Sequence, residues 1–122
     1  MKVVIAGSRT IKELRTLQKS LDRLSCLNNH ILDEITTVIS GKAIGVDTLG
    51  EKWATAHNIK VASRPADWSL GRGAGHIRNG EMADEADFGI ILWDGESPGT
   101  RGMIREMQKR NKPYFLDVVK DV

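Results

Sequence analysis

Short apolar runs alternate along the chain with longer segments whose apolar residues recur every three or four positions. The runs are rich in β-branched side chains, which is typical of strands that are buried on both faces of a sheet. The longer segments have the spacing of a single apolar helical face. The pattern therefore predicts helices between strands, with the strands at residues 3–6, 36–39, 59–62, 88–93 and 114–118.

The first of these helices should open with a capping box, in which Thr10 and Glu13 exchange hydrogen bonds. Asp47 should cap the second helix. The third spans residues 74–86, and Thr100 should cap a fourth that begins at Arg101. Residues 111–113 should end that helix. After the last strand, the final four residues should form a loose tail. The expected buried positions in these helices are Ile11, Leu14, Leu17, Leu21, Leu24, Leu27, Leu49, Trp53, Ala54, Ala56, Ile77, Met82, Ala86, Met103, Ile104 and Met107.

Strict alternation of strand and helix indicates a parallel sheet with helices on both faces. No linker or internal repeat interrupts it, so the 122 residues are expected to form one domain. Ligands of such sheets bind beyond the carboxyl ends of the strands. The loops that should meet there are residues 7–9, 40–46, 65–73 and 94–99.

Residues 90–101 contain the most informative of these connections, an apolar strand followed by a turn cluster and a helix start. The free N–H groups and the dipole at a helix start favour a bound anion. An ordinary strand-to-helix connection is the alternative, because one glycine-rich loop is a weak signal. Three of the four loops are rich in Gly, Ser and Thr, and three hold or adjoin a cation, which favours a phosphate-bearing ligand.

Composition narrows the classes of partner. The formal net charge of +2 is nearly balanced, so nucleic acid is not expected as a partner. The single cysteine, Cys26, excludes an internal disulfide and suits a reducing compartment. The apolar run after Met1 is too short for a signal peptide, and none approaches the length of a membrane span. We therefore expect a cytoplasmic protein with no membrane partner.

Metal chemistry has little support in the sequence. His30, His57 and His76 share no ligand spacing, so no zinc site is expected. Asp94 is a candidate for contacting a ribose, or a Mg²⁺ ion that accompanies a phosphate ligand. No Ser–His–Asp arrangement is persuasive, and catalytic residues stay unassigned.

The loops also carry ordered motifs. Gly7-Ser8-Arg9 follows the first strand, and Gly41 to Asp47 reads Gly-Lys-Ala-Ile-Gly-Val-Asp. The later motifs are Pro65-Ala66-Asp67-Trp68, then Ala74-Gly75 with Arg78-Asn79 and Met82, then Trp93-Asp94-Gly95 with Ser97, Gly99 and Thr100. In this order they resemble the YspA-type branch of the SMF/DprA–LOG (SLOG) nucleotide-binding superfamily, over nearly the whole chain.

The resemblance implies a single-domain, Rossmann-like, three-layer α/β/α fold with the first strand central, in the strand order 3-2-1-4-5. It implies a nucleotide or nucleotide-derived ligand across the strand ends, and a homodimer. LOG relatives are phosphoribohydrolases that cleave an N-glycosidic bond with an arginine, which Arg78 matches, and with a glutamate after a glycine-rich loop. DprA relatives bind single-stranded DNA, but they carry extra domains that this chain lacks.

Two departures from the family pattern bear on function. Gly102 and Met103 stand where LOG enzymes have the glutamate, and Glu106 lies a turn further along. The second motif has Lys42 in place of a glycine and Ile44 in place of an arginine. The first departure removes the obvious carboxylate for stabilising an oxocarbenium-like centre.

Each candidate side chain has a functional and a structural interpretation. Arg78 can clamp a phosphate or ribose, or pair with Glu81 or Asp84. Arg9 can reach a phosphate or lie on the surface. Trp68 and Trp93 can each stack on a base or pack in the core, and core packing is the favoured interpretation for Trp93. Asn79 suits a structural hydrogen bond and Asp47 a cap. The candidate ligand-binding residues are Gly7, Ser8, Arg9, Ser40, Gly41, Gly45, Asp47, Trp68, Arg78, Asn79, Asp94, Ser97, Gly99, Thr100 and Arg101.

Two main hypotheses of different classes follow. The first is a binding module that captures a nucleotide or nucleotide-derived molecule without chemistry. The second is a nucleotide hydrolase of the LOG type. The missing glutamate favours the first, and a purely structural interaction protein is a third. A homodimer is expected from the resemblance and from the apolar face of Met103, Ile104 and Met107.

Overall fold

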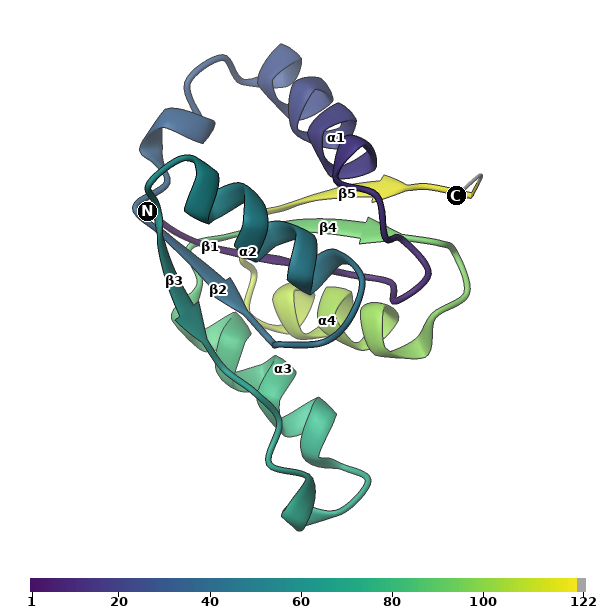
Figure 1. Ribbon diagram of the computed structural model, residues 1–122. Helices are drawn as coiled ribbons and strands as arrows, with labels where there is room; N and C mark the ends of the chain where they lie inside the picture. The colour runs from purple at the N-terminus through teal and green to yellow at the C-terminus, as the bar shows by residue number, and fades with distance from the viewer. Residues whose placement is uncertain (121–122) are drawn as a thin grey trace.

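Five parallel strands form one sheet in the order β3-β2-β1-β4-β5 in the computed structural model, which describes residues 1–120 (Figure 1). The strands are β1 (Lys2–Gly7), β2 (Thr37–Ser40), β3 (Lys60–Ser63), β4 (Phe88–Trp93) and β5 (Tyr114–Val118). Every neighbouring pair is parallel. The expected Rossmann-like α/β/α fold with this strand order is confirmed.

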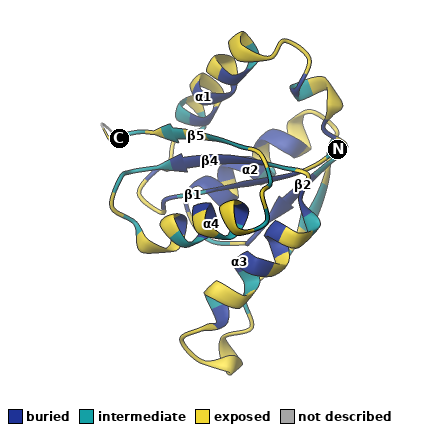
Figure 2. Ribbon diagram, turned by 180° about the vertical axis from the view of Figure 1, so that it is seen from behind, coloured by how far each residue is buried: buried dark blue, intermediate teal, exposed yellow. Residues whose placement is uncertain are grey.

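Helices cover both faces of the sheet. Figures 1 and 2 show α1 (Leu14–Leu27) and α2 (Val46–Ala56) on one face, and α3 (Ala74–Glu85) and α4 (Pro98–Lys109) on the other. Two short 3-10 helices that the sequence pattern did not predict lie in the connections, η1 (Leu32–Glu34) and η2 (Trp68–Leu70). In Figure 2 the central strands are buried and the outer faces of the helices are exposed.

The two apolar layers take alternate residues of the same strand. Val3 and Ile5 of β1 belong to the cluster under α1 and α2, whereas Val4 and Ala6 belong to the cluster under α3 and α4. This is the period-two alternation of a strand that is buried on both sides. Trp53 lies in the first cluster, as expected.

Strand β1 lies where the chain changes direction within the sheet. The chain runs outward from β1 through β2 to β3, then crosses through α3 to β4 on the other side. The ends of β1 and β4 stay together, because Gly7 pairs with Leu92 and Ser8 N donates to Leu92 O at 3.1 Å. A Cβ atom at Gly7 would lie 2.1 Å from Leu92 O, so only glycine fits there. In this fold such a switch point is the usual ligand site.

Helix α1 does not open with the predicted capping box. Thr10 Oγ1 donates instead to Asp94 Oδ2 at 3.0 Å, and the Glu13 carboxylate accepts a bond from Arg15. The hydroxyl therefore joins two loops at the strand ends rather than serving its own helix, and α1 starts at Leu14.

The predicted caps of α2 and α4 are also wrong. Helix α2 begins at Val46 after the left-handed Gly45 (φ 84°), so Asp47 lies inside its first turn. Helix α4 begins at Pro98 after Ser97, so Thr100 lies inside as well. Proline suits the first helical position because its fixed φ matches the helix and its missing N–H costs nothing there.

Three expected core positions are exposed. Leu27 is 76% exposed at the end of α1, Ile77 is 50% exposed, and Ala56 is exposed on the last turn of α2. The first turns of α3, which include Ile77, extend beyond the sheet together with η2 (Figure 1). Met103, Ile104 and Met107 are buried within the monomer, which removes the apolar face that had supported a dimer.

The predicted tail is only partly described. Val119 N donates to Trp93 O at 2.7 Å, which continues the pairing beyond β5, so the tail is not loose at this residue. Residues 121 and 122 lie outside the described residues.

Candidate functional site

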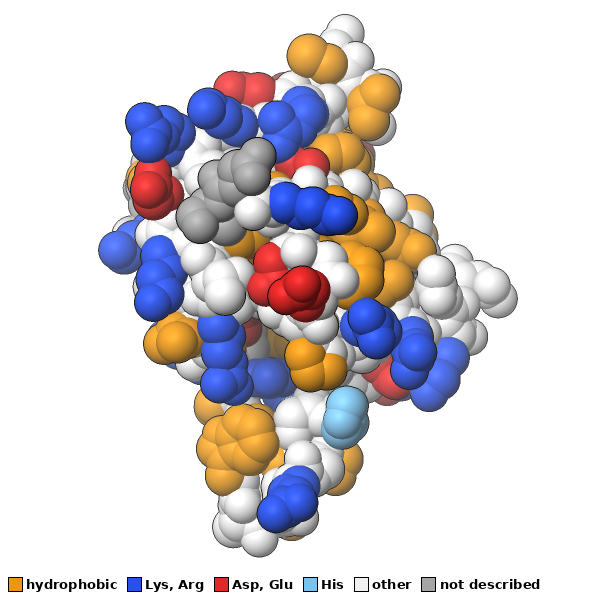
Figure 3. Space-filling view, turned by 90° about the vertical axis from the view of Figure 1, so that its right-hand side faces the viewer, with side chains coloured by type: hydrophobic (Ala, Val, Ile, Leu, Met, Phe, Trp, Pro, Cys, Tyr) orange, Lys and Arg blue, Asp and Glu red, His pale blue; other side chains and the backbone are white. Residues whose placement is uncertain are grey.

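A cavity of about 340 Å³ lies at the switch point of the sheet. Figure 3 views the molecule from the side on which β1 and β4 end, where the surface is hollowed and Lys and Arg side chains lie near the hollow. Four separate parts of the chain line it: the end of β1, the loop and first turn leading into α2, the middle of α3, and the start of α4. The lining residues are Ala6, Gly7, Arg9, Ala43, Asp47, Arg78, Asn79, Met82, Ser97, Pro98, Gly99, Thr100 and Met103.

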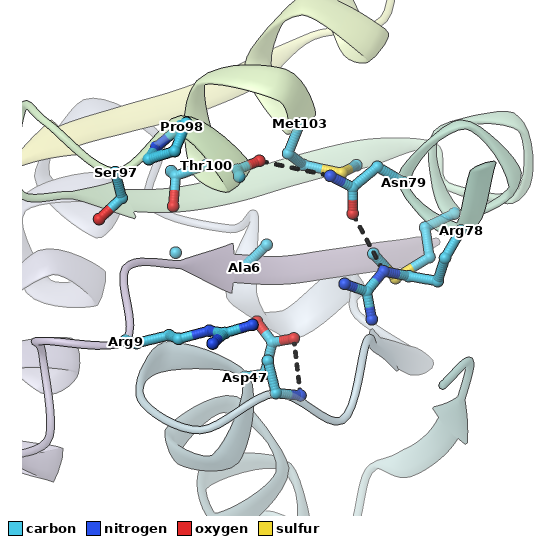
Figure 4. A pocket seen from close by; sticks show the side chains of 13 residues that line it. Ala6, Arg9, Asp47, Arg78, Asn79, Ser97, Pro98, Thr100 and Met103 are labelled. Carbon is cyan, nitrogen blue, oxygen red and sulfur yellow. Dashed lines mark hydrogen bonds between the residues drawn. The ribbon is translucent and has the colours of Figure 1, made fainter. Parts of the chain in front are cut away.

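The start of α4 forms one wall of the cavity, with Ser97 and Thr100 on it in Figure 4. Among residues 1–120, no acceptor bonds the backbone N–H groups of Gly99 and Thr100. A Cβ atom at Gly99 would meet nothing within 4 Å, so the protein leaves open space there. Two free N–H groups at the positive end of a helix dipole, on residues that line a cavity, suit an anion.

Arg78 reaches the cavity from α3, and its guanidinium is held by two bonds. Nε donates to Asn79 Oδ1 at 3.1 Å, and Nη1 donates to Gly41 O. No acidic side chain of the described residues lies within 4.0 Å of it, and Asp84 pairs with Arg110 instead. The predicted alternative, an ion pair with Glu81 or Asp84, is therefore wrong. Nη2 has no acceptor among residues 1–120, so it is available to a ligand.

Of the carboxylates in residues 1–120, Asp47 alone lines the cavity, and it is 5% exposed. Burial raises its pKa from 3.8 to about 6, while the Ala43 N–H and the charge of Arg78 act in the opposite direction. Ala43 N donates to its Oδ2 at 3.2 Å, and no side chain of residues 1–120 donates to it. Arg9 and Asp47 lie on the wall opposite Ser97 and Thr100 in Figure 4.

The loop between β2 and α2 explains the departures from the family motif. Lys42 has a left-handed backbone (φ 63°), the conformation that a glycine adopts without strain, and its Nζ pairs with Glu51 at 2.8 Å. Ile44 is 60% exposed and does not line the cavity. Neither Lys42 nor Ile44 therefore lines the cavity.

Asp94 does not line the cavity, and its carboxylate instead holds the turn before α4. Its carboxylate accepts bonds from the backbone N–H groups of Glu96 and Ser97 and from the hydroxyls of Ser97 and Thr10. These bonds hold the pKa of Asp94 well below its usual range. The carboxylate thus organises the turn before α4, which fixes the helix start at the cavity.

The structure brings eight of the candidate ligand-binding residues together in the lining: Gly7, Arg9, Asp47, Arg78, Asn79, Ser97, Gly99 and Thr100. Four others support the neighbouring loops. Ser8 O accepts a bond from Val46 N, Ser40 Oγ donates to Glu51, and Gly41 O accepts one from Arg78. At Gly45 a Cβ would lie 2.5 Å from Ser8 O.

The remaining candidates lie outside the lining. Besides Asp94 these are Trp68, which is 61% exposed on η2 and so is not a core residue, and Arg101. The guanidinium of Arg101 lies 5.5 Å from the centre of the Trp93 ring, which is partly buried against the core. Arg101 therefore stacks on a neighbouring aromatic side chain.

Sequence reasoning missed five lining residues: Ala6, Ala43, Met82, Pro98 and Met103. They are apolar, and periodicity identifies Met82 and Met103 only as core residues. Two signals were available. Ala43 and Met82 belong to the ordered motifs, and Ala6 and Pro98 lie directly beside the motif residues Gly7, Ser97 and Gly99 in the sequence.

A second hollow, of about 640 Å³, lies between α1, η1 and α2. Asp22, Asp33 and His57 line it, together with apolar side chains and Gln18, and no lysine or arginine does. It therefore lacks the charge that a phosphate needs. Among residues 1–120 no group of three His, Cys, Asp or Glu side chains is placed to hold a metal ion.

Two further observations concern the helices of residues 1–120 and the side chain of Glu106. No helix of the described part is long and apolar enough to cross a bilayer. Glu106, the nearest acid to the position of the LOG glutamate, is held by Arg110 at 2.8 Å and Lys109 at 3.2 Å and does not line the cavity.

Comparison with known protein families gives a match. A family model described as "YspA, cpYpsA-related SLOG family" matches residues 1–71, which is more than half of the chain. The matched part contains β1, β2, β3 and the loops of Gly7 and Gly41. No curated protein matches the chain.

Proposed function

The chain belongs to the YspA, cpYpsA-related SLOG family, and from that premise we propose that it binds a nucleotide or nucleotide-derived ligand. The ligand occupies the cavity at the ends of β1 and β4, with its phosphate at the start of α4. The resemblance to nucleotide-binding relatives, first suggested by the ordered loop motifs, supports this class of ligand.

One observation carries the proposal: Gly99 and Thr100, whose N–H groups have no acceptor among residues 1–120, line a cavity that Arg9 and Arg78 also line. A phosphate there would accept two backbone hydrogen bonds at the positive end of a helix. The free Nη2 of Arg78 adds a charged donor. The guanidinium is already oriented by Asn79 and Gly41, so little side-chain freedom is lost on binding.

The second candidate is a nucleotide hydrolase of the LOG phosphoribohydrolase type. Asp47 favours it, because a buried carboxylate whose pKa is about 6 lies in the same cavity as Arg78. Glu106 does not contribute, since its carboxylate is engaged by Arg110 and Lys109. The binding module remains the first proposal, because the glutamate of the LOG pattern is missing.

A panel of nucleotides separates the two. The purified protein is incubated with nucleoside monophosphates, ADP-ribose, NAD and cyclic nucleotides, and thermal unfolding is followed together with product chromatography. A ligand at a hundredfold its dissociation constant should stabilise the fold by about 2.7 kcal/mol. Stabilisation without product supports the binding module, and release of a free base supports the hydrolase. Unchanged melting across the panel would contradict both.

Further parts of the proposal concern cofactor and location. A Mg²⁺ ion that accompanies the phosphate would not be held by Asp94, since Asp94 does not line the cavity. Repeating the titration with EDTA tests for the ion.

We place the protein in the cytoplasm, with a small molecule rather than nucleic acid as its ligand, and fluorescent tagging in cells checks the location.

A further inference from the structure

The two long walls of the cavity differ in charge. The start of α4 presents backbone N–H groups and no carboxylate, whereas the opposite wall presents the Asp47 carboxylate next to Arg9. An ionised carboxylate that is 5% exposed is costly unless hydrogen bonds satisfy it. Ala43 N–H bonds one oxygen at 3.2 Å, and no side chain of residues 1–120 donates to the carboxylate.

These walls orient a nucleotide. The phosphate is repelled by Asp47 and attracted by the free N–H groups of Gly99 and Thr100, so it binds at the α4 wall. The groups that then face Asp47 are those that carry hydrogen-bond donors and no negative charge. In a nucleotide the sugar hydroxyls meet this condition, and they lie next to the phosphate-bearing carbon chain.

From this arrangement we propose that Asp47 accepts hydrogen bonds from the ribose hydroxyls of the bound nucleotide, so that the cavity selects ribonucleotides over 2′-deoxyribonucleotides. The inference rests on the proposed nucleotide binding and adds the class of sugar. A carboxylate has two acceptor oxygens, which suits the two hydroxyls of a cis-diol. A 2′-deoxy ligand leaves this buried carboxylate short of a donor, and sites of that kind discriminate strongly against the analogue.

Asp47 also has a role in the protein that a test must separate from ligand binding. Its Oδ2 holds the loop before α2 through Ala43 N–H. An asparagine keeps a carbonyl oxygen for this bond but loses the charge and one acceptor. Asp47→Asn is therefore the informative variant. Glu51→Gln is the matched control, because Glu51 lies on the same helix, pairs with Lys42 and Ser40, and does not line the cavity.

The experiment measures dissociation constants by calorimetry for matched pairs, AMP with 2′-dAMP and GMP with 2′-dGMP. In the wild type the ribonucleotide should bind about ten- to a hundredfold more tightly, the effect of one charged hydrogen bond. Asp47→Asn should bring this ratio close to one, mainly by weakening the ribonucleotide. Glu51→Gln should keep the wild-type ratio.

The contrary outcomes are distinct. If no nucleotide of either sugar binds, the proposed function fails and this inference falls with it. If both sugars bind equally to the wild type, nucleotide binding stands and the role of Asp47 is wrong. That role is also wrong if Asp47→Asn keeps the wild-type preference. The comparison of the two sugars on the wild type needs no variant, so it tests the sugar preference even if Asp47→Asn does not fold.

Discussion

Asn79 reaches from α3 to the start of α4, where its Nδ2 donates a hydrogen bond to Gly99 O at 3.3 Å. The same amide accepts the Nε bond of Arg78 through its Oδ1. One buried side chain thus fixes the guanidinium relative to the helix start that we propose as the phosphate site. Positioned donors of this kind bind with little loss of side-chain freedom.

Arg78→Ala should weaken nucleotide binding by about ten- to a hundredfold. The variant loses a charged hydrogen bond to the phosphate or ribose, which contributes roughly 1.5–3 kcal/mol. Arg78→Lys should recover only part of the loss, because a point charge cannot reproduce the planar fork. Calorimetric titration with the nucleotide that gives the largest thermal shift measures all three proteins.

The matched control is Arg105→Ala, which removes the same charge from an exposed position on α4 outside the cavity lining. Arg78→Ala also loses the bonds to Gly41 O and Asn79, so it should melt lower than the control. The dissociation constant therefore decides, not the melting temperature. Equal constants for wild type and Arg78→Ala would remove Arg78 from the site.

Gly99→Ala should weaken nucleotide binding without lowering the stability of the fold, whereas Arg78→Ala should lower both. A Cβ atom at Gly99 meets no protein atom within 4 Å, and alanine is the better helix former, so the fold should be unchanged or stabilised by up to about 1 kcal/mol. The added methyl should obstruct the phosphate, and affinity should fall. Chemical denaturation and the same titration measure both effects. Unchanged affinity would place the phosphate elsewhere.

The sheet could be predicted because its signals are local. Val3 to Ala6 is apolar at every position, and such a run fits a strand that is covered on both faces. The positions of Arg78 and Asn79 came from the family motif, which indicates a site without giving its geometry.

The helix starts and the burial of Asp47 could not be predicted from the sequence. Thr10 fits a capping box, but its hydroxyl bonds Asp94, 84 residues away. Asp47 fits a cap, but the chain turns at Gly45, where the Val46 N–H bonds Ser8 O, and this moves the carboxylate into the cavity. Contacts between distant loops decide both cases, and local propensity does not contain them.

The two left-handed positions of the second motif should respond differently to substitution. Lys42→Gly relieves backbone strain at a left-handed position. It also removes an exposed ion pair and raises the conformational entropy of the unfolded chain, so the free energy of unfolding should change by less than about 1 kcal/mol. Gly45→Ala should cost about 2 kcal/mol or more, because its Cβ would lie 2.5 Å from Ser8 O at φ 84°. Urea unfolding compares them, and equal effects would contradict this account.

The homodimer stays a prediction, and the structure changes where its interface should lie. An apolar patch of Trp68, Leu70 and Ile77 is exposed where η2 meets α3. Light scattering at micromolar concentration should report a dimer, and Trp68→Ser should shift it toward monomer. Leu27→Ser, at an exposed leucine on α1, is the control and should stay dimeric. A monomeric wild type would end the prediction.

Asp47 should make the stability of the fold depend on pH between about 4 and 6. Burial raises its pKa from 3.8 to about 6, despite the Ala43 N–H and the charge of Arg78. The folded chain thus holds this proton more tightly than the unfolded chain. The stability that Asp47 contributes is complete below pH 3.8 and is lost as the pH rises through 6. At 1.36 kcal/mol per pKa unit the loss is about 3 kcal/mol.

The test is the difference in the free energy of unfolding between wild type and Asp47→Asn, measured with urea from pH 4 to pH 8. The wild type should lose about 2.5 kcal/mol relative to the variant across this range, because part of the full loss has already occurred at pH 4. A difference is needed because Glu51, whose pKa is lowered by its bonds to Lys42 and Ser40, acts with the opposite sign. Glu51→Gln should accordingly differ from wild type mainly at the acid end and in the other direction, with a smaller change toward pH 6 because the Glu51 charge helps to raise the pKa of Asp47. A wild-type to Asp47→Asn difference that stays flat through pH 6 would show that the carboxylate is not buried as the cavity requires.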